Sequence, residues 1–414
     1  MYKLPKIELY SSQMEEIVRE QYPVIVFGNG MLGKAIVDLL LEMGANVTDI
    51  FDNNKQLEGS VYNGIKITCP RQVENENTVV IVSVYLYMAE ITEQMKKLGV
   101  HKIYPYYGCF LGQEVSEEFY WNNDGSIQDA SYIEKKKLLE EKGDVVDIDS
   151  VDITITEKCS LKCKHCANLL QYYTNPKDEE FEKISHAVKR LAECVDLIGR
   201  VSILGGEPLL CKDLSRYVDI CTNIENIENI LVVTNGTIVP TEELITALKK
   251  DNRCVLSVSN YGSISRNKEK IIELSRQEDF RIAITRRENG IWRELGKIEY
   301  VDLSNDELEE KWNECLIKKY LSIKDGKLFV CPFAANAYSL QAIPQNDVEY
   351  VDLVDETVSI EELRVQVKEF LQRKSHPECR YCIEKGKKAK LIPAAEQIKE
   401  PLPFVKYTYE GGKV

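Results

Sequence analysis

The chain has 414 residues, of which 44% are hydrophobic and 29% are charged, and its formal net charge is −14 at pH 7. This length allows two or three domains with separate cores, and the composition is that of an ordinary globular protein. The acidic balance excludes a large basic surface for duplex nucleic acid, and the sequence has no apolar run long enough for a membrane helix. We therefore expect neither a nucleic-acid partner nor a membrane partner.

A strand, a glycine-rich loop and a helix are predicted near the N-terminus. Residues 24–27 are apolar, the glycines follow directly, and residues 34–43 have a helical pattern. This order is the fingerprint of a dinucleotide-binding unit, in which glycines permit a tight turn and the close approach of a phosphate. The alternative is a glycine turn that binds nothing. The predicted nucleotide contacts are Gly28, Gly30, Gly33 and the acidic residue after the next strand, Asp52.

Further strands at 78–84 and 102–105 complete this N-terminal segment. Residues 1–107 resemble the small Rossmann-like modules of sugar-processing and glycan-assembly proteins. The resemblance implies either a nucleotide or nucleotide-sugar ligand or an interaction domain. Residues 108–150, which are rich in loop signals, are predicted to form a connector.

Three thiols lie within eight residues, directly after an alternating strand at 151–156. They belong to Cys159, Cys163 and Cys166. Thiolates bind both iron–sulfur clusters and zinc, and a cubane cluster normally takes four of them, so three leave one iron open. The residues alone leave a second interpretation, a structural zinc site completed by His165 or another cysteine.

The spacing of three residues and then two resembles that of radical S-adenosylmethionine enzymes. A buried strand at 201–205 then ends in Gly205, Gly206 and Glu207, and the family holds the amino group of S-adenosylmethionine with such a motif. Glycines let a backbone approach a ligand closely, and a carboxylate can pair with an ammonium group. The resemblance implies a 4Fe–4S cluster at the three cysteines, with S-adenosylmethionine on its open iron.

Strands and helices alternate between residues 151 and 305. Such alternation predicts parallel strands joined by crossover helices. Five or six units resemble the partial (β/α)6 barrel of the radical enzymes, with active groups at the carboxyl ends of the strands. We predict strands at 151–156, 201–205, 229–234, 254–259 and 280–285, and helices near 178–198, 212–223, 241–250 and 266–277.

Polar residues follow the later strands, where the family places contacts to S-adenosylmethionine. By that resemblance the candidates are Thr234, Asn235, Ser257, Ser259 and Asn260. Arg286 and Arg287 are candidates for binding a substrate or cofactor anion, because guanidinium groups bind carboxylate or phosphate bidentately. The alternatives are a turn, a pair of strand-end residues and a solvated basic pair. Cys211 and Cys254 are candidate hydrogen donors for an epimerase, although each also suits simple packing.

Four more cysteines lie towards the C-terminus: Cys315, Cys331, Cys379 and Cys382. A hairpin around Asp325-Gly326 is predicted to bring the first two together, and the Cys-x-x-Cys pair completes a closed site for zinc or a cluster. The spacing resembles that of the Twitch domain, a short relative of the SPASM domain, which holds one auxiliary 4Fe–4S cluster. We assign this domain to residues 306–392 and expect the proline-containing tail, 393–414, to lie over the surface.

The family resemblance covers about residues 151–385. It implies that S-adenosylmethionine is cleaved reductively, with flavodoxin or ferredoxin as electron donor, and that hydrogen is then taken from a small-molecule substrate. The N-terminal module favours a sugar, cyclitol or nucleotide-linked carbohydrate, which would be dehydrogenated or epimerised. The alternatives are a peptide-modifying maturase of the SPASM/Twitch type and a non-catalytic zinc-binding interaction protein. Thirteen cysteines without a signal peptide favour the reducing cytoplasm.

Overall fold

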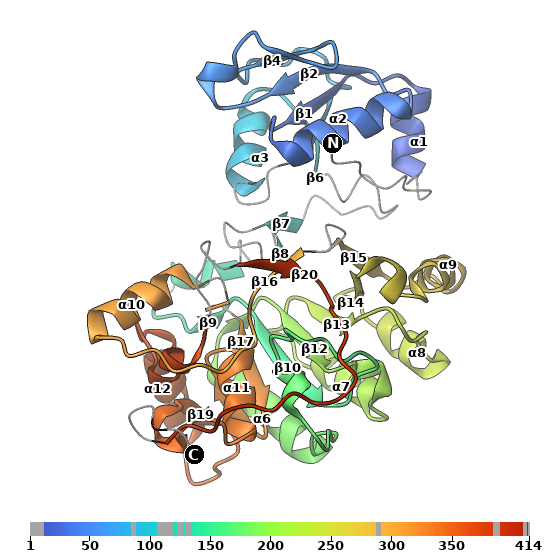
Figure 1. The fold of residues 1–414 in the computed structure, drawn as a ribbon. Helices are drawn as coiled ribbons and strands as arrows, with labels where there is room; N and C mark the ends of the chain where they lie inside the picture. Colours follow the sequence, from blue (N-terminus) through green and yellow to red (C-terminus); the bar gives the residue numbers. More distant parts are fainter. Residues whose placement is uncertain are drawn as a thin grey trace. The chain divides into compact units, whose positions relative to one another are not determined.

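The structure is a computed structural model that describes residues 12–83, 88–105, 119–121, 127–129, 135–136, 138–141, 143–286, 291–315, 317–318, 320–383, 390–408 and 412. Contacts along the chain divide it into two compact units, Met1–Ile133 and Glu134–Val414. Each unit has a mixed α/β fold with parallel strands (Figure 1). Within the described ranges, we find no helix whose length and hydropathy would let it traverse a bilayer. Most of the predicted connector lies outside these ranges.

The first unit contains a six-stranded sheet in the order β3–β4–β2–β1–β5–β6, in which only β3 and β4 are antiparallel to each other. Its central strand, β1, reads VIVF and is buried throughout, as expected for a parallel strand with helices on both faces. Val24 and Val26 pack in one core cluster and Ile25 and Phe27 in another. The elements are α1 (Ser12–Arg19), β1 (Val24–Phe27), α2 (Met31–Glu42), β2 (Val47–Phe51), β3 (Val61–Tyr62), β4 (Ile65–Thr68), β5 (Val79–Val82), α3 (Met88–Lys97) and β6 (Lys102–Pro105).

The second unit is built on an eight-stranded sheet in the order β15–β14–β13–β12–β10–β17–β18–β19. The strands β15, β14, β13, β12, β10 and β17 are parallel to one another, whereas β18 is antiparallel to both β17 and β19. The strands are β10 (Val151–Thr156), β12 (Val201–Gly205), β13 (Ile230–Thr234), β14 (Cys254–Asn260), β15 (Ile282–Arg286), β17 (Leu321–Lys324), β18 (Lys327–Phe329) and β19 (Tyr350–Asp352). The helices are α6 (Phe181–Cys194), α7 (Leu214–Thr222), α8 (Glu242–Lys249), α9 (Lys268–Glu278), α10 (Asn305–Glu314), α11 (Pro332–Ser339) and α12 (Ile360–Leu371).

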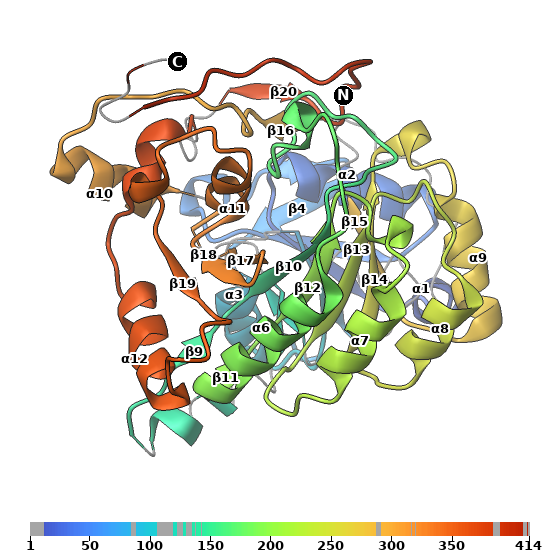
Figure 2. The same cartoon turned by 90° about the horizontal axis from the view of Figure 1, so that it is seen from below.

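The predicted strands and helices between 151 and 305 are confirmed, each to within four residues at either end. The register of these strands explains why the alternation of strands and helices could be predicted. One row of paired residues crosses the sheet and is apolar throughout: Ile323, Ile153, Ile203, Val232, Leu256 and Ile282. Figure 2 shows α6, α7, α8 and α9 side by side along one face, and an apolar row is what such helices require.

The opposite face of this sheet, here called the polar face, carries several polar residues among apolar ones. Residues on a strand point alternately to the two faces, so Asp152, Thr154 and Thr156 share the face opposite Ile153. Ser257 and Ser322 lie on this same face by their pairing with neighbouring strands. All of these polar side chains are buried. The second unit therefore encloses polar groups near the sheet, which an ordinary core would avoid.

The predicted hairpin around Asp325 and Gly326 is confirmed, and both residues have the positive φ that such a turn needs. Its position in the fold was not predicted. Strand β17 pairs in parallel with β10, so the hairpin extends the sheet that carries the first cysteine loop. Ile323 fits the apolar row beside Ile153, and this accounts for the pairing.

Candidate active site

The carboxyl ends of five neighbouring parallel strands meet at one edge of the second-unit sheet. The loop with Cys159, Cys163 and Cys166 follows β10, and Glu207 lies just after β12. Asn235 follows β13, and Asn260 ends β14. Most of the predicted cluster and cofactor residues are therefore brought to one edge, as the prediction required.

Gly205 and Gly206 pack directly against the cysteine loop. A Cβ atom at Gly205 would lie 2.1 Å from the carbonyl oxygen of Thr156, and one at Gly206 would lie 2.2 Å from that of Lys158. The backbone N–H of Gly206 donates to the Thr156 carbonyl over 2.8 Å. In the structure these glycines allow two loops to approach each other, and their contact with a ligand stays a prediction.

The Glu207 side chain is completely buried. Its carboxylate accepts hydrogen bonds from Thr234 Oγ1 (2.8 Å), from the backbone N–H of Asn235 (2.8 Å) and from that of Leu209 (3.2 Å). Burial raises the pKa of this carboxyl group, and the three donors oppose the rise. Glu207 therefore joins the loops after β12 and β13, and its contact with a cofactor amino group stays a prediction.

Asn235 connects the β13 loop to the first cysteine. Its Nδ2 donates to Ser160 Oγ over 3.0 Å and approaches Cys159 Sγ at 3.7 Å. On the other side, Asn168 Nδ2 donates to the Gly205 carbonyl over 3.0 Å. The cysteine loop is thus fixed from both flanking loops, which is the preorganisation a metal centre needs.

A segment near the C-terminus also holds the cysteine loop, and no local sequence pattern predicts this contact. The backbone N–H of Lys164 donates to the Glu396 carbonyl, and that of Ile398 donates to the Lys162 carbonyl, each over 2.8 Å. Gln397 Nε2 donates to Cys163 Sγ over 3.2 Å. We expected this tail to lie over the surface, but it pairs with the loop that carries the three thiols.

Cys163 is buried, and Cys159 and Cys166 are half-buried. Loss of solvation raises the pKa of Cys159 to about 12 and those of Cys163 and Cys166 to about 11. They are therefore protonated at neutral pH without a metal, so metal binding must displace protons. The twelve cysteines within the described residues form no disulfide. All three thiols are consequently available as metal ligands.

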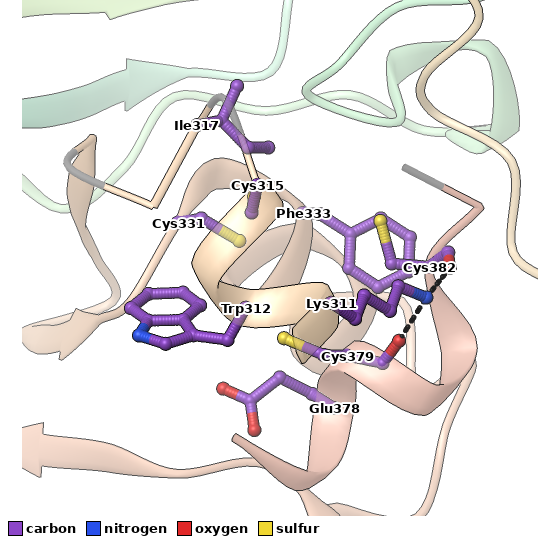
Figure 3. Close-up of a pocket in the computed structure, with 9 residues that line it drawn as sticks. All are labelled: Lys311, Trp312, Cys315, Ile317, Cys331, Phe333, Glu378, Cys379 and Cys382. Atoms are coloured by element: carbon purple, nitrogen blue, oxygen red, sulfur yellow. Dashed lines mark hydrogen bonds between the residues drawn. The ribbon is translucent and has the colours of Figure 1, made fainter. Parts of the chain in front are cut away.

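The structure also brings together the four C-terminal cysteines. They line one pocket with Lys311, Trp312, Ile317, Phe333 and Glu378 (Figure 3). Lys311 Nζ donates to the backbone carbonyls of Cys379, over 2.7 Å, and Cys382. Burial raises the pKa of the Cys331 and Cys379 thiols well above the usual range. A compact four-thiol site of the predicted composition is therefore present.

The remaining candidates in the second unit differ in their placement. Ser257 and Ser259 are buried on the polar face, and Asn260 Oδ1 accepts from the backbone N–H of Gly262 over 3.0 Å. At the end of β15, the backbone of Arg286 pairs with that of Asn260. The predicted anion contact by Arg287 lies outside the described residues.

The two candidate hydrogen donors lie at opposite edges of the sheet. The short helix η4 (Pro208–Leu210) begins directly after Glu207, and Cys211 follows this helix. Cys211 therefore lies close to the cysteine loop. Cys254 begins β14 and pairs with Ile230, at the far end of the strand from Asn260. The structure therefore brings Cys211, but not Cys254, to the edge that carries the candidate site.

In the first unit, Asp52 binds the glycine loop. Its two carboxylate oxygens accept from the backbone N–H groups of Asn29 and Asn54, each over 2.8 Å. Gly28 has a φ of 105°, and a Cβ at Gly33 would lie 1.7 Å from the Gly28 carbonyl oxygen. Gly30 precedes α2 as its N-cap. The tight turn is therefore present, and nucleotide binding stays a prediction.

A substitution at Gln397 tests its contact with the cysteine loop. Gln397→Leu removes the N–H donor to Cys163 Sγ, and hydrogen bonds to cluster sulfurs stabilise the reduced state. We expect the reduction potential of a cluster bound there to fall by on the order of tens of millivolts, measured by a redox titration followed by electron paramagnetic resonance. Gln366→Leu, at an exposed position on α12, is the control. Equal reduction potentials in Gln397→Leu and Gln366→Leu would contradict the assignment of a hydrogen bond from Gln397 to a cluster sulfur.

Comparison with known proteins finds two family models that each match part of the chain. Residues 153–287 match the model of the Radical SAM superfamily, and residues 20–104 match that of C2185-like, N-terminal. GTP 3′,8-cyclase of Aquifex aeolicus (strain VF5) is 27% identical over 161 residues, which cover 38% of this chain and 49% of the relative. GTP 3′,8-cyclase of Clostridium acetobutylicum is 32% identical over 106 residues, covering 25% and 31%. The chain thus spans half or less of the length of these relatives.

Solved structures also resemble part of the chain. BtrN in complex with AdoMet and 2-DOIA is 13% identical, with a TM-score of 0.39 over 57% of this chain and 93% of that one. Streptococcus suis SuiB bound to S-adenosylmethionine is 15% identical, with a TM-score of 0.28 over 43% and 38%. The match of residues 153–287 to the Radical SAM superfamily supports a radical SAM enzyme.

Proposed function

We propose that this protein is a radical SAM enzyme that removes hydrogen from a sugar, cyclitol or nucleotide-linked carbohydrate and thereby dehydrogenates or epimerises it. The observation that carries the proposal is the placement of three unlinked thiols at the carboxyl edge of a parallel sheet. The loops of Glu207 and Asn235 fix the thiol-bearing segment in that position. We assign the strands β10 and β12 to β15 to a partial (β/α)6 barrel.

In this proposal Cys159, Cys163 and Cys166 hold a 4Fe–4S cluster. S-adenosylmethionine contacts the segments 205–207, 234–235 and 257–260. When bound, the cluster and S-adenosylmethionine supply one-electron bond cleavage and hydrogen abstraction. The chain itself holds the cysteine loop rigidly through Asn235 and presents buried polar groups such as Ser257, which position ligands and limit access of water.

The four C-terminal cysteines, Cys315, Cys331, Cys379 and Cys382, are proposed to hold an auxiliary 4Fe–4S cluster in a Twitch-like segment. Their grouping in one pocket supports this assignment. Such a cluster suits an oxidising enzyme, because it can accept an electron from the substrate. Flavodoxin or ferredoxin is the proposed reductant, and the cytoplasm the proposed location.

The first unit supports a carbohydrate-related substrate. Its parallel strands follow the order β4–β2–β1–β5–β6, the order expected of a Rossmann-like module. We propose that its glycine loop, with Gly28, Gly30, Gly33 and Asp52, binds a nucleotide or nucleotide sugar. This step rests on domain analogy and is weaker than the argument from the cysteines.

A free nucleotide is the second candidate substrate, because the similar curated proteins carry the name GTP 3′,8-cyclase. A peptide substrate, as for a maturase, is the third. A non-catalytic zinc-binding interaction protein is the remaining alternative.

The decisive experiment follows deuterium from candidate substrates into 5′-deoxyadenosine. The protein is purified and reconstituted without oxygen, reduced, and incubated with S-adenosylmethionine and one deuterated compound at a time. The panel contains nucleotide sugars, cyclitols, GTP and peptides. Deuterium uptake from a sugar or cyclitol supports the proposal. Uptake only from GTP or only from peptides assigns the alternative substrate, and a colourless zinc protein without turnover would refute the enzyme assignment.

The auxiliary site is tested by replacing Cys379 and Cys382 with alanine. We expect S-adenosylmethionine cleavage to continue while substrate oxidation stops, because the first cysteine loop is unchanged. The measurement compares 5′-deoxyadenosine with product in the same reaction, and Cys221→Ala, a buried cysteine on α7, is the control. Product formation at the control rate would show that the second site is only structural.

A further inference from the structure

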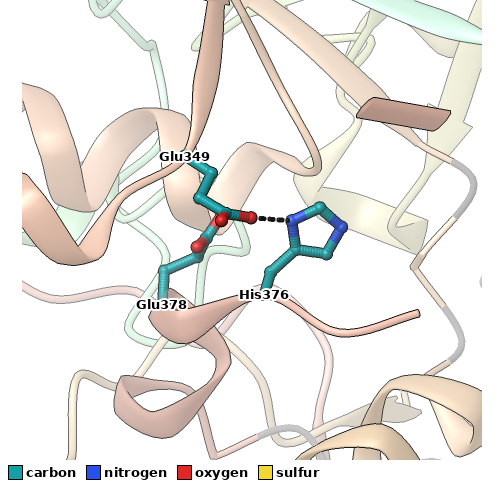
Figure 4. Close-up of side chains that lie close together, drawn as sticks. All are labelled: Glu349, His376 and Glu378. Carbon is teal, nitrogen blue, oxygen red and sulfur yellow. Dashed lines mark hydrogen bonds and ion pairs between the residues drawn. The ribbon is translucent and has the colours of Figure 1, made fainter. Parts of the chain in front are cut away.

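Three side chains outside the proposed active site form a compact group of possible metal ligands. Glu349 lies just before β19, and His376 and Glu378 belong to the short helix η7 (Pro377–Tyr381) and its N-cap. One ligand atom from each lies within 4.8 Å of the other two. Figure 4 shows the two carboxylates directed towards each other, with the imidazole beside them.

Glu378 is the residue of this group whose surroundings indicate a bound ligand. Its side chain is 1% exposed, and neither carboxylate oxygen has a hydrogen-bond partner at bonding geometry among the described residues. The backbone amides of Glu349 and Glu378 lie near enough to offset part of the burial, but not all of it. A buried carboxylate is strongly unfavourable unless it is paired or bound to a metal.

The neighbouring cations are already engaged. His376 Nδ1 lies 2.9 Å from Glu349 Oε2, and Arg373 forms an ion pair with the same carboxylate. His376 is itself buried against the rings of Trp312 and Phe370, with centroid distances of 4.7 and 5.5 Å. Two carboxylates therefore meet in a largely dry region, and Arg373, whose charge also acts on Glu378, is paired with Glu349.

We propose that Glu349, His376 and Glu378 bind one divalent first-row transition metal ion. Two carboxylates and one imidazole are donors that suit Mn²⁺, Fe²⁺ or Zn²⁺, and a divalent ion would neutralise the charge that the protein leaves unpaired. The site adjoins the four-cysteine pocket, which Glu378 also lines, but it uses no thiol (Figure 3). The proposal does not depend on the proposed function.

Manganese is the probe, because oxygen and nitrogen donors accept Mn²⁺ whereas thiolate sites select softer ions. The full-length holoprotein is titrated anaerobically with MnCl₂, and free Mn²⁺ is measured by electron paramagnetic resonance. We expect one equivalent to bind to the wild type. Glu378→Gln and His376→Asn should each bind Mn²⁺ at least tenfold more weakly. Glu356→Gln, at a side chain that is 84% exposed, should bind normally.

Two further measurements keep the outcomes distinct. Melting temperature should rise with Mn²⁺ in the wild type and in the Glu356→Gln control, but not in Glu378→Gln. The Cys379→Ala, Cys382→Ala variant should still bind one equivalent of Mn²⁺, because the proposed site uses no thiol. Wild-type protein that binds no Mn²⁺, or Glu378→Gln that binds it with wild-type affinity, would overturn the proposal. If Glu378→Gln does not fold, His376→Asn and the wild-type titration decide in the same way.

Discussion

Replacing Cys159, Cys163 and Cys166 together with alanine is expected to abolish 5′-deoxyadenosine formation and to remove about half of the bound iron. The three thiols are the ligands proposed for one of two clusters of equal size. The four-cysteine pocket is formed by other elements and should keep its iron. The measurements are iron content per chain and 5′-deoxyadenosine formed under reducing, anaerobic conditions.

The matched control is Cys194→Ala, which removes a thiol buried at the end of α6. It should keep full iron content and full activity, with at most a small loss of stability. Wild-type iron content in the triple variant would contradict the assignment of these thiols, and so would loss of all iron in a protein that remains folded.

Replacing Glu207 with glutamine is expected to destabilise the second unit by about 2–4 kcal/mol and to weaken S-adenosylmethionine binding at least tenfold. The carboxylate accepts three hydrogen bonds, and bonds to a charged group contribute about 1.5–3 kcal/mol each. Glutamine presents an NH₂ group to one of these donors, so at least one buried donor loses its partner. The loop that fixes Cys159 through Asn235 would then loosen.

Denaturant unfolding and calorimetric titration with S-adenosylmethionine measure the two effects separately. Glu225→Gln, at an exposed position after α7, is the control and should change neither. If Glu207→Gln lost affinity without losing stability, the carboxylate would act on the cofactor directly, as first predicted from the sequence. If neither the stability nor the affinity for S-adenosylmethionine changed, the link that Glu207 makes between the loops after β12 and β13 would be unimportant.

Much of the second unit could be predicted because its signals are local. Apolar strands such as 151–156 and 201–205 alternate with helical patterns, and the turn at Asp325-Gly326 has a backbone conformation that few residues accept. The cysteine spacings likewise indicated both thiol groups, and the structure brings each group together.

The contacts that local patterns do not encode were missed. The pairing of β17 with β10 depends on two segments far apart in the chain that share an apolar register, which no single window of sequence reveals. The contact of Gln397 with Cys163 joins residues even further apart. Glu378 was missed because burial turns an ordinary acidic residue into an unpartnered one, and burial of this kind follows only from the tertiary structure.

The position of Gln397 has a consequence for biogenesis. Proteins fold as they leave the ribosome, with earlier segments folding first. The strands of the second-unit sheet can therefore assemble before the segment around Gln397 has been translated, but the loop at 162–164 cannot reach its final conformation until that segment arrives. Nascent chains would expose the thiols to oxidants during this interval, so delivery of iron and sulfide is expected to follow translation rather than accompany it.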